Sequence, residues 1–405
     1  PQSAIRNPQS LLPYFVGVRN GGQEHMDVVA HDNQEVIRAR FSDADFFYRR
    51  DTEKPLEAFL PRLATLTFQE RLGSMLDKTH RLEQLAGHLA QTLGLSDEET
   101  QIAQRAAHLC KADLATHMVV EFTSLQGAMG REYALKSGEL PAVAEAILEH
   151  YLPRSAGDAL PRTRTGLVVG LASRLDSLAG LFAVGLTPTG SADPYHLRRD
   201  ALGLVQALLA HGVPFSIREG LAAAARLLPV EMSQDTLTAA LAFVVERLRG
   251  TLREQGFHYD VVDAVLAARG DDPFRAHQAV EALSRWVVRD DWSRTLDNYA
   301  RCVRITREFE ERFPLDPARF VHPAEEELHA AYQEARARVA PQSTVDEFLT
   351  TFLPLVDVID RFFAKESGVM VMAEDPALRE NRLALLQHVA ALADGIADLS
   401  RLEGF

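Results

Sequence analysis

The sequence predicts a mainly α-helical protein of several domains, with a small β-containing segment at its N-terminus. From about Pro61 onward, apolar residues recur at helical spacing and prolines interrupt the pattern often, which suits an irregular helical architecture better than a parallel sheet. Before that point the apolar residues come in short β-rich runs. The chain has 405 residues, 46% of them hydrophobic, and this length is enough for roughly two to four domains.

Residues 1–50 contain the only strands that we expect. Three short β-rich runs follow one another there, YFVGVRNGG, MDVVAHDNQ and EVIRARF, and Asn20-Gly21-Gly22 is a turn signal at the end of the first. The pattern favours a hairpin. Ser42 or Asp43 is then a candidate cap for a helix that carries Phe46 and Phe47.

The region 61–228 is expected to be one helix after another. Leucines recur at helical spacing over residues 80–93, and Ser96 precedes three acidic residues that suit a first helical turn. Asp193 is a plausible N-cap with Pro194 at the first helical position. The apolar stripe of that helix leaves Arg198 and Arg199 at the border of its packed face.

The remaining chain is expected to form a helical connecting module and then a helical bundle. Residues 229–289 look helical with breaks at Gly250, Gly256 and Gly270. A helix is predicted over 294–313. A last helix is predicted from the stripe formed by Leu378, Leu385, Val389, Leu392, Ile396 and Leu399.

Composition excludes several classes of protein. Only Cys110 and Cys302 are present, too few and too far apart for a disulfide framework or a thiolate metal site. No membrane span or signal peptide is recognised, so we expect a cytoplasmic protein. The formal net charge of −14 argues against a general nucleic-acid coat, although a local basic surface is compatible with it.

No common nucleotide or hydrolase motif is found. The nearest match to a phosphate loop, residues 73–79, lacks two of the glycines that such a loop needs. Metal phosphohydrolases of the HD superfamily use a His, then a His-Asp pair, then a distant Asp. The corresponding residues here are His80, Ala112 with Asp113, and Asp176. Because Ala112 cannot bind a metal, we expect no metal site and no hydrolase activity.

Other polar clusters have structural interpretations beside the functional ones. His108 and His117 lie near the Ala112 position and leave open a rearranged metal site, and Glu149-His150-Tyr151 is read as a structural or RNA-facing cluster in preference to a catalytic base. In the helix predicted near residue 300, arginines gather opposite the apolar face, at positions 294, 301, 304, 307 and 312. Glu308, Glu310 and Glu311 partly neutralise them, so an ordinary solvated helix is as good an interpretation as an RNA contact.

Several separate segments resemble the β subunit of the bacterial heterotetrameric glycyl-tRNA synthetase, in the order found in that family. They are NQEVIRARFSDADFFYRRD, FQERLGSMLDK, KADLATHMVVEFTSLQGAMGREYA, AILEHYLP, ASRLDSLAGLFAVGLTPTG, PTGSADPYHLRRDALG and VMVMAEDPALRENRLALL. The similarity is weakest between about residues 218 and 285. Family members extend beyond Pro1, so we expect the chain to be the C-terminal portion of such a subunit.

The resemblance implies a domain order and a division of labour. Residues 1–60 would end a truncated tRNA-contacting module, 61–228 would be an HD-like helical domain, 229–289 a connecting module, and 290–405 a bundle similar to an anticodon-binding domain. The chain would have no catalytic residue and bind no cofactor. ATP and Mg²⁺ would bind at the α subunit of an α2β2 ligase, and this subunit would hold tRNA(Gly) for glycylation.

The expected tRNA contacts are arginines, because a guanidinium group suits both phosphate and unpaired bases. The stronger candidates are Arg301, Arg304, Arg379 and Arg382, and the weaker ones are Arg198 and Arg199. Two other readings stay open: an HD-type metal-dependent phosphohydrolase, which would hold a metal at His80, Asp113 and Asp176, and a non-catalytic helical scaffold.

Overall fold

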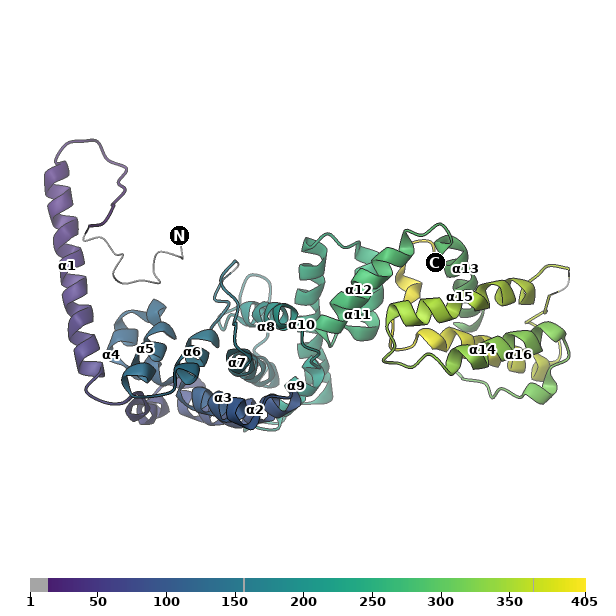
Figure 1. Ribbon diagram of the computed structural model, residues 1–405, viewed down its shortest axis with the longest axis horizontal. Helices are drawn as coiled ribbons and strands as arrows, with labels where there is room; N and C mark the ends of the chain where they lie inside the picture. Colours follow the sequence, from purple (N-terminus) through teal and green to yellow (C-terminus); the bar gives the residue numbers. More distant parts are fainter. Residues whose placement is uncertain (1–13, 156, 367) are drawn as a thin grey trace.

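The computed structural model describes residues 14–155, 157–366 and 368–405. The helices follow one another along an elongated molecule, with α1 standing away from the body at one end and the C-terminal bundle at the other (Figure 1). The predicted mainly helical fold is confirmed.

The N-terminal half contains α1 (Met26–Asp51), η3 (Leu56–Thr65), β1 (Thr67–Gln69), β2 (Gly73–Ser74), α2 (Met75–Thr92), α3 (Asp97–Leu109), η4 (Ala112–Ala115), α4 (His117–Glu121), η5 (Thr123–Leu125), α5 (Ala128–Lys136), α6 (Pro141–Glu149), α7 (Arg164–Ala183), α8 (Leu197–His211) and α9 (Ile217–Ala225). The C-terminal half contains α10 (Gln234–Glu254), α11 (Tyr259–Arg269), α12 (Pro273–Val287), α13 (Trp292–Thr306), η6 (Pro317–Arg319), α14 (Pro323–Arg336), α15 (Val345–Phe362), α16 (Pro376–Ala390), η7 (Ala391–Ala393) and η8 (Leu399–Arg401).

The hairpin expected within residues 1–50 is wrong where the structure describes that segment. Residues 26–51 form the single helix α1, which also contains the helix start expected at Ser42 or Asp43. The strands lie later, where β1 and β2 pair antiparallel just before α2. The β-branched residues of the segment suggested strands, but its apolar positions also recur at helical spacing, and the last turns of the helix pack against α4.

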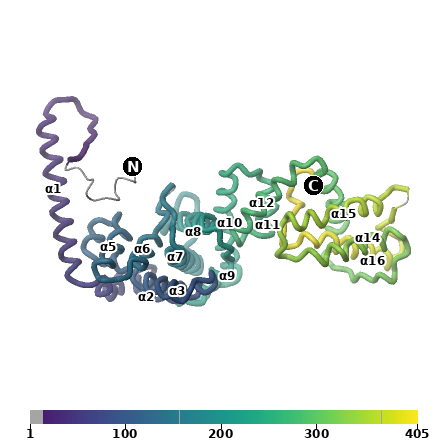
Figure 2. The backbone as a smooth tube through the Cα atoms, viewed as in Figure 1, coloured from purple at the N-terminus to yellow at the C-terminus, as the bar shows by residue number. Residues whose placement is uncertain are grey.

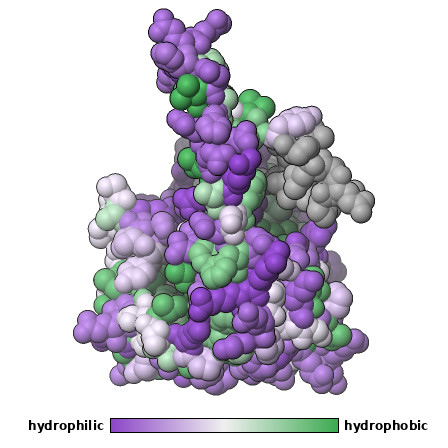
Figure 3. All heavy atoms as spheres, turned by 90° about the vertical axis from the view of Figure 1, so that its left-hand side faces the viewer, coloured by the Kyte–Doolittle hydropathy of each residue, from purple (hydrophilic) through white to green (hydrophobic). Residues whose placement is uncertain are grey.

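The base of α1 is held by one buried carboxylate. Asp51 accepts hydrogen bonds from the backbone N–H groups of His117 and Met118, at 3.0 and 2.9 Å, and from the Tyr133 hydroxyl at 3.0 Å. The rest of the helix stands clear of the body, and hydrophobic side chains appear among its mostly hydrophilic surface (Figure 3). Phe41 is 72% exposed on this helix.

Serine capping boxes begin two of these helices, and the one at Ser96 confirms the helix start predicted there. Ser74 with Asp77 starts α2, and Ser96 with Glu99 starts α3, each as a reciprocal pair of side-chain and backbone hydrogen bonds. The most deeply buried helix is α7, which packs against α2, α3, α6, α8 and α9. By length and composition it is apolar enough to cross a membrane, yet 89% of its most apolar stretch is buried inside the structure, as in a core helix.

Several predicted helix boundaries are corrected. The helix expected from Pro194 begins at Leu197, because His196 adopts a left-handed conformation with φ 58°. Asp193 nevertheless caps it, by accepting from the N–H groups of Leu197 and Arg198. Gly250 does not break a helix but lies inside α10. The helix predicted over 294–313 is α13, which ends at Thr306.

The last predicted helix is also shorter than expected. It ends at Ala390, and 3-10 turns with a left-handed Gly395 continue the chain. Ile396 and Leu399 are still buried. They reach the core from a tail that folds back on the bundle, and not from a continuous helix. That tail brings the C-terminus to the point where the bundle meets α11 and α12 (Figure 2), and the Asp398 N–H donates to the Ala264 carbonyl at 2.8 Å.

The domain boundaries stay predictions. The boundary at 228/229 falls between α9 and α10, and that at 289/290 falls between α12 and α13. The boundary at 60/61 falls inside η3.

Candidate nucleic-acid interface

The positions compared with HD hydrolases do not share one open centre. His80 lies exposed on α2, whereas Asp113 and Asp176 are completely buried or nearly so. Asp176 lies between two cations: Lys78 Nζ is 2.7 Å from Oδ2, and Arg81 Nε is 2.6 Å from Oδ1. Burial raises the pKa of this carboxyl, but Lys78 and Arg81 outweigh that effect and the pKa is lowered. Its oxygens are therefore occupied by protein donors.

Asp113 has a different environment. Oδ2 accepts from the Gly127 N–H at 2.6 Å, and no protein group donates to Oδ1 among the described residues. Burial raises the pKa of Asp113 to about 6, against the lowering effect of the Gly127 N–H. Ala112 beside it is fully buried. The carboxylate therefore stabilises the turn before α5, in which Gly127 adopts a φ of 78°.

The two histidines considered for a rearranged metal site are held by different carboxylates. His108 Nδ1 lies 2.8 Å from Glu83, and His117 Nδ1 lies 2.7 Å from Asp51. In the described part of the chain, one group of His and acidic residues has ligand atoms close enough to surround an ion, formed by His258, Asp260 and Glu403. The oxygens of Asp260 already accept from His258, Val261 N–H and Glu403 N–H. The bond from Glu403 attaches the C-terminal tail to α11.

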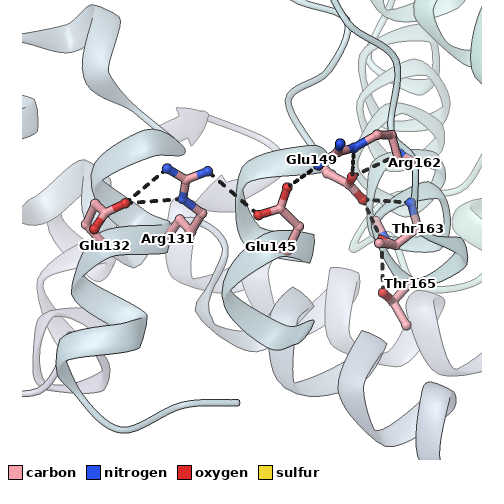
Figure 4. A network of polar contacts seen from close by, with 8 residues as sticks. Arg131, Glu132, Glu145, Glu149, Arg162, Thr163 and Thr165 are labelled. Atoms are coloured by element: carbon pink, nitrogen blue, oxygen red, sulfur yellow. Dashed lines mark hydrogen bonds and ion pairs between the residues drawn. The ribbon is translucent and has the colours of Figure 1, made fainter. Parts of the chain in front are cut away.

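The Glu149-His150-Tyr151 segment has a structural role. Glu149 accepts from the backbone N–H groups of Arg162 and Thr163, at 2.9 and 3.1 Å, and from the Thr163 hydroxyl, as Figure 4 shows. Its carboxylate thus fixes the loop that precedes α7. On the same side of α6, Arg131 bridges Glu132 and Glu145.

His150 is buried beside a lysine. Its Nδ1 donates to the Ile147 carbonyl at 2.6 Å, so Nε2 is the acceptor for Lys111 Nζ at 2.8 Å. Burial lowers the pKa of Lys111, and burial with the nearby Lys111 lowers the pKa of His150 far below its usual range. Because His150 is only 2% exposed, it does not face RNA.

The candidate arginines Arg198 and Arg199 differ in burial and in hydrogen-bond partners. Arg198 is half-buried and donates from Nη2 to the Gly190 carbonyl at 2.6 Å, so it closes the loop before α8. Arg199 is exposed, and no acidic partner lies within 4.0 Å among the residues described. Arg199 is thus available to an external anion.

The basic face of α13 is largely paired with acidic residues. Arg294 Nη2 lies 2.6 Å from Asp360 of α15, and Arg301 contacts the same carboxylate at 3.0 Å and Asp297 at 2.9 Å. Arg304 lies 3.9 Å from Asp297 and 5.4 Å from the ring centre of Phe405. These side chains remain 40% or more exposed, so a phosphate would compete with existing ion pairs.

The candidate arginines of α16, Arg379 and Arg382, also differ in burial and in ion-pair partners. Arg382 is 8% exposed and its Nε lies 2.6 Å from Glu325. Arg379 is half-buried, and within the described ranges it has no ion-pair partner at 4.0 Å or less. Both arginines were predicted contacts because of their charge and their place in the C-terminal bundle. Glu325, which pairs with Arg382, lies more than fifty residues earlier in the chain.

Exposed apolar side chains near this pair were not singled out from the sequence. They are Val321, Met370 and Met372. The signal that could have found them is the run VMVM after a helix end, in which Val369 and Val371 are buried while the two methionines are exposed.

A family model described as glycyl-tRNA synthetase beta subunit matches residues 3–267. The chain belongs to this family. It is 44% identical to the glycine–tRNA ligase beta subunit of Desulforudis audaxviator and 41% identical to that of Moorella thermoacetica, over 96% and 97% of the chain. It spans 57% of the length of each.

A plant relative shows the same similarity in a longer protein. The chain is 37% identical to glycine–tRNA ligase, chloroplastic/mitochondrial 2, of Arabidopsis thaliana, over 100% of this chain and 38% of that protein. The similarity to this family therefore continues through the C-terminal bundle, beyond the residues that the family model matches.

Proposed function

We propose that this chain is part of the tRNA-holding subunit of a cytoplasmic glycine–tRNA ligase of α2β2 composition. It would position tRNA(Gly) while the α subunit binds glycine, ATP and Mg²⁺ and carries out both chemical steps. The observation that carries the proposal is the similarity of nearly the whole chain, at 37–44% identity, to proteins named as glycine–tRNA ligases. The fully engaged carboxylate of Asp176 supports it, because that residue is not free to serve a hydrolytic metal.

The purified chain is expected to show no glycine-dependent exchange of pyrophosphate into ATP. The reason is that the sequence contains no recognisable phosphate loop or other nucleotide motif. The measurement is the exchange assay with the chain alone, with α subunit alone, and with both. Exchange by the chain alone, in a preparation shown by mass spectrometry to be free of α subunit, would contradict the proposed division of labour.

The six candidate arginines are proposed to differ in their contribution to tRNA binding. Arg199 and Arg379 are not ion-paired among the described residues and would meet phosphates. Arg198, Arg301, Arg304 and Arg382 would contribute less, because their guanidinium groups already have partners.

We therefore expect Arg199→Ala and Arg379→Ala each to weaken tRNA(Gly) binding and to reduce the salt slope by roughly 0.7 to 0.9. Arg301→Ala combined with Arg304→Ala should change the slope less than either single variant. Fluorescence anisotropy at several salt concentrations measures both quantities. A larger change of the salt slope in the variant with both Arg301→Ala and Arg304→Ala would indicate that α13 contacts the tRNA instead.

A further inference from the structure

The end of α6 is joined to α7 through one buried histidine. His150 follows the last residue of α6, and its ring centre lies 3.8 Å from that of Tyr151. The backbone carbonyls of His150 and Leu152 accept from Arg174 of α7, at 3.3 and 2.6 Å. The backbone of His150 also passes close to α7 at Gly170, where an added Cβ would lie 3.6 Å from its Cα. His150 therefore lies at the contact between the two helices.

The two contacts of the imidazole require its neutral form. Nδ1 donates to the Ile147 carbonyl, so Nε2 accepts from Lys111 Nζ at 2.8 Å. The same Nζ lies 4.3 Å from the ring centre of Tyr151, an arrangement that favours a charged lysine. A proton on Nε2 would place two donors and two positive charges against each other in the interior. The closed structure therefore excludes that proton.

The charged groups around the imidazole oppose its protonation as well. Those that act on it most strongly are all cations: Lys111, Arg174 of α7 and Lys78 of α2. Asp113 and Asp200 act on Lys111 and favour its charged form against the effect of burial. Burial and the three cations together hold the pKa of His150 far below its usual range.

We propose that His150 is an acid-sensitive joint between α6 and α7. When Nε2 takes a proton from solvent, it no longer accepts from Lys111, and the two cations repel each other, so the end of α6 separates from α7. The joint is a property of the fold and does not rest on the proposed function.

The direction of the pH effect follows from proton binding. The opened segment binds a proton that the closed one excludes, so a fall in pH shifts the equilibrium toward opening. The stability that the closed joint contributes is complete above the ordinary histidine pKa of about 6.5. It is lost progressively as the pH falls from there toward the lowered pKa of His150.

His211 of α8 provides a matched control. Its Nε2 lies 2.9 Å from the carbonyl oxygen of Pro161, just before α7. A carbonyl only accepts, so this nitrogen carries the hydrogen, and a second proton on Nδ1 leaves the bond intact. Both histidines thus hold the connection between α6 and α7, but His150 does so as an acceptor and His211 as a donor.

The test is hydrogen exchange of the full chain at pH 7 and pH 5, corrected for the intrinsic exchange rate. In the wild type, the opening equilibrium for the amides of α6 should rise about 25-fold, as expected for one histidine with a pKa of about 6.5 when open that stays neutral when closed. His150→Gln keeps an acceptor for Lys111 and should reduce the rise to less than about twofold. His211→Gln should leave the rise unchanged.

A direct titration decides the matter if His150→Gln does not fold. In the wild-type chain with ¹³C-labelled histidine, the NMR signal of the His150 imidazole should show no protonation of the closed form down to pH 5. Titration of His150 with an ordinary pKa in the folded chain would overturn the proposal. An equal pH effect in His150→Gln would do the same, and so would acceleration of the same size in α14 and α15, because the opening would then not be local.

Discussion

Replacing Asp176 with asparagine is expected to destabilise the protein by about 3–5 kcal/mol, which is the usual cost of removing one partner from a buried ion pair. Asp176 is 1% exposed, and its two oxygens balance the buried cations of Lys78 and Arg81. Asparagine keeps the shape but leaves both cations without a counter-charge in the interior. The variant should unfold at a lower urea concentration, with hydrogen exchange in α2 and α7 accelerated most.

The effect should depend on pH in a defined direction. Lys78 and Arg81 lower the pKa of Asp176 against the raising effect of burial, so its contribution is present above the ordinary aspartate pKa of about 3.9 and is lost as the pH falls further. The difference between wild type and Asp176→Asn should therefore be full at pH 7 and shrink below about pH 4. Asp45→Asn, which removes one side of an exposed pair with Arg49, is the control; an equal loss there would contradict this account.

Replacing Arg382 with alanine is expected to cost about 2–4 kcal/mol, somewhat less than Asp176→Asn. The buried Glu325 carboxylate loses its cation but keeps the N–H groups of Val321 and His322 as donors. The measurement is the urea midpoint followed by circular dichroism, together with hydrogen exchange in the loops before α14 and α16. Arg361→Ala, which removes an exposed pair with Glu327 in the same bundle, should cost less than about 1 kcal/mol.

An arginine at position 382 that served only RNA binding would give the opposite result. Its removal would then leave stability unchanged and reduce the salt slope of tRNA binding. The two outcomes separate a structural role from a direct contact.

Features that depend on neighbouring residues were predictable from the sequence. The capping boxes that begin α2 and α3 need only a serine and an acidic residue three positions later, and the apolar stripes of α8 and α16 are local patterns as well. In α1 the β-branched residues suggested strands, whereas the structure has one helix whose last turns pack against α4.

The candidate site was less predictable because its electrostatics are non-local. Arg294 and Arg301 of α13 meet Asp360 about sixty residues later, and Arg382 meets Glu325 more than fifty residues earlier. The local pair of Arg301 with Asp297 is four residues apart and could be anticipated, but the pairs with Asp360 and Glu325 could not. The family similarity supports tRNA as the proposed ligand, whereas only the structure distinguishes Arg379 from Arg382 on the same helix.

The central claim is that this chain binds tRNA(Gly) specifically, and a titration against tRNA(Gly) and an unrelated tRNA at two salt concentrations tests it most directly. With a net charge of −14, the chain has little non-specific attraction for RNA, and higher salt should weaken what there is. The account predicts tighter binding of tRNA(Gly) at both salt concentrations, with a ratio between the two tRNAs that persists or grows as salt rises. Equal affinity for both tRNAs at both concentrations would contradict it.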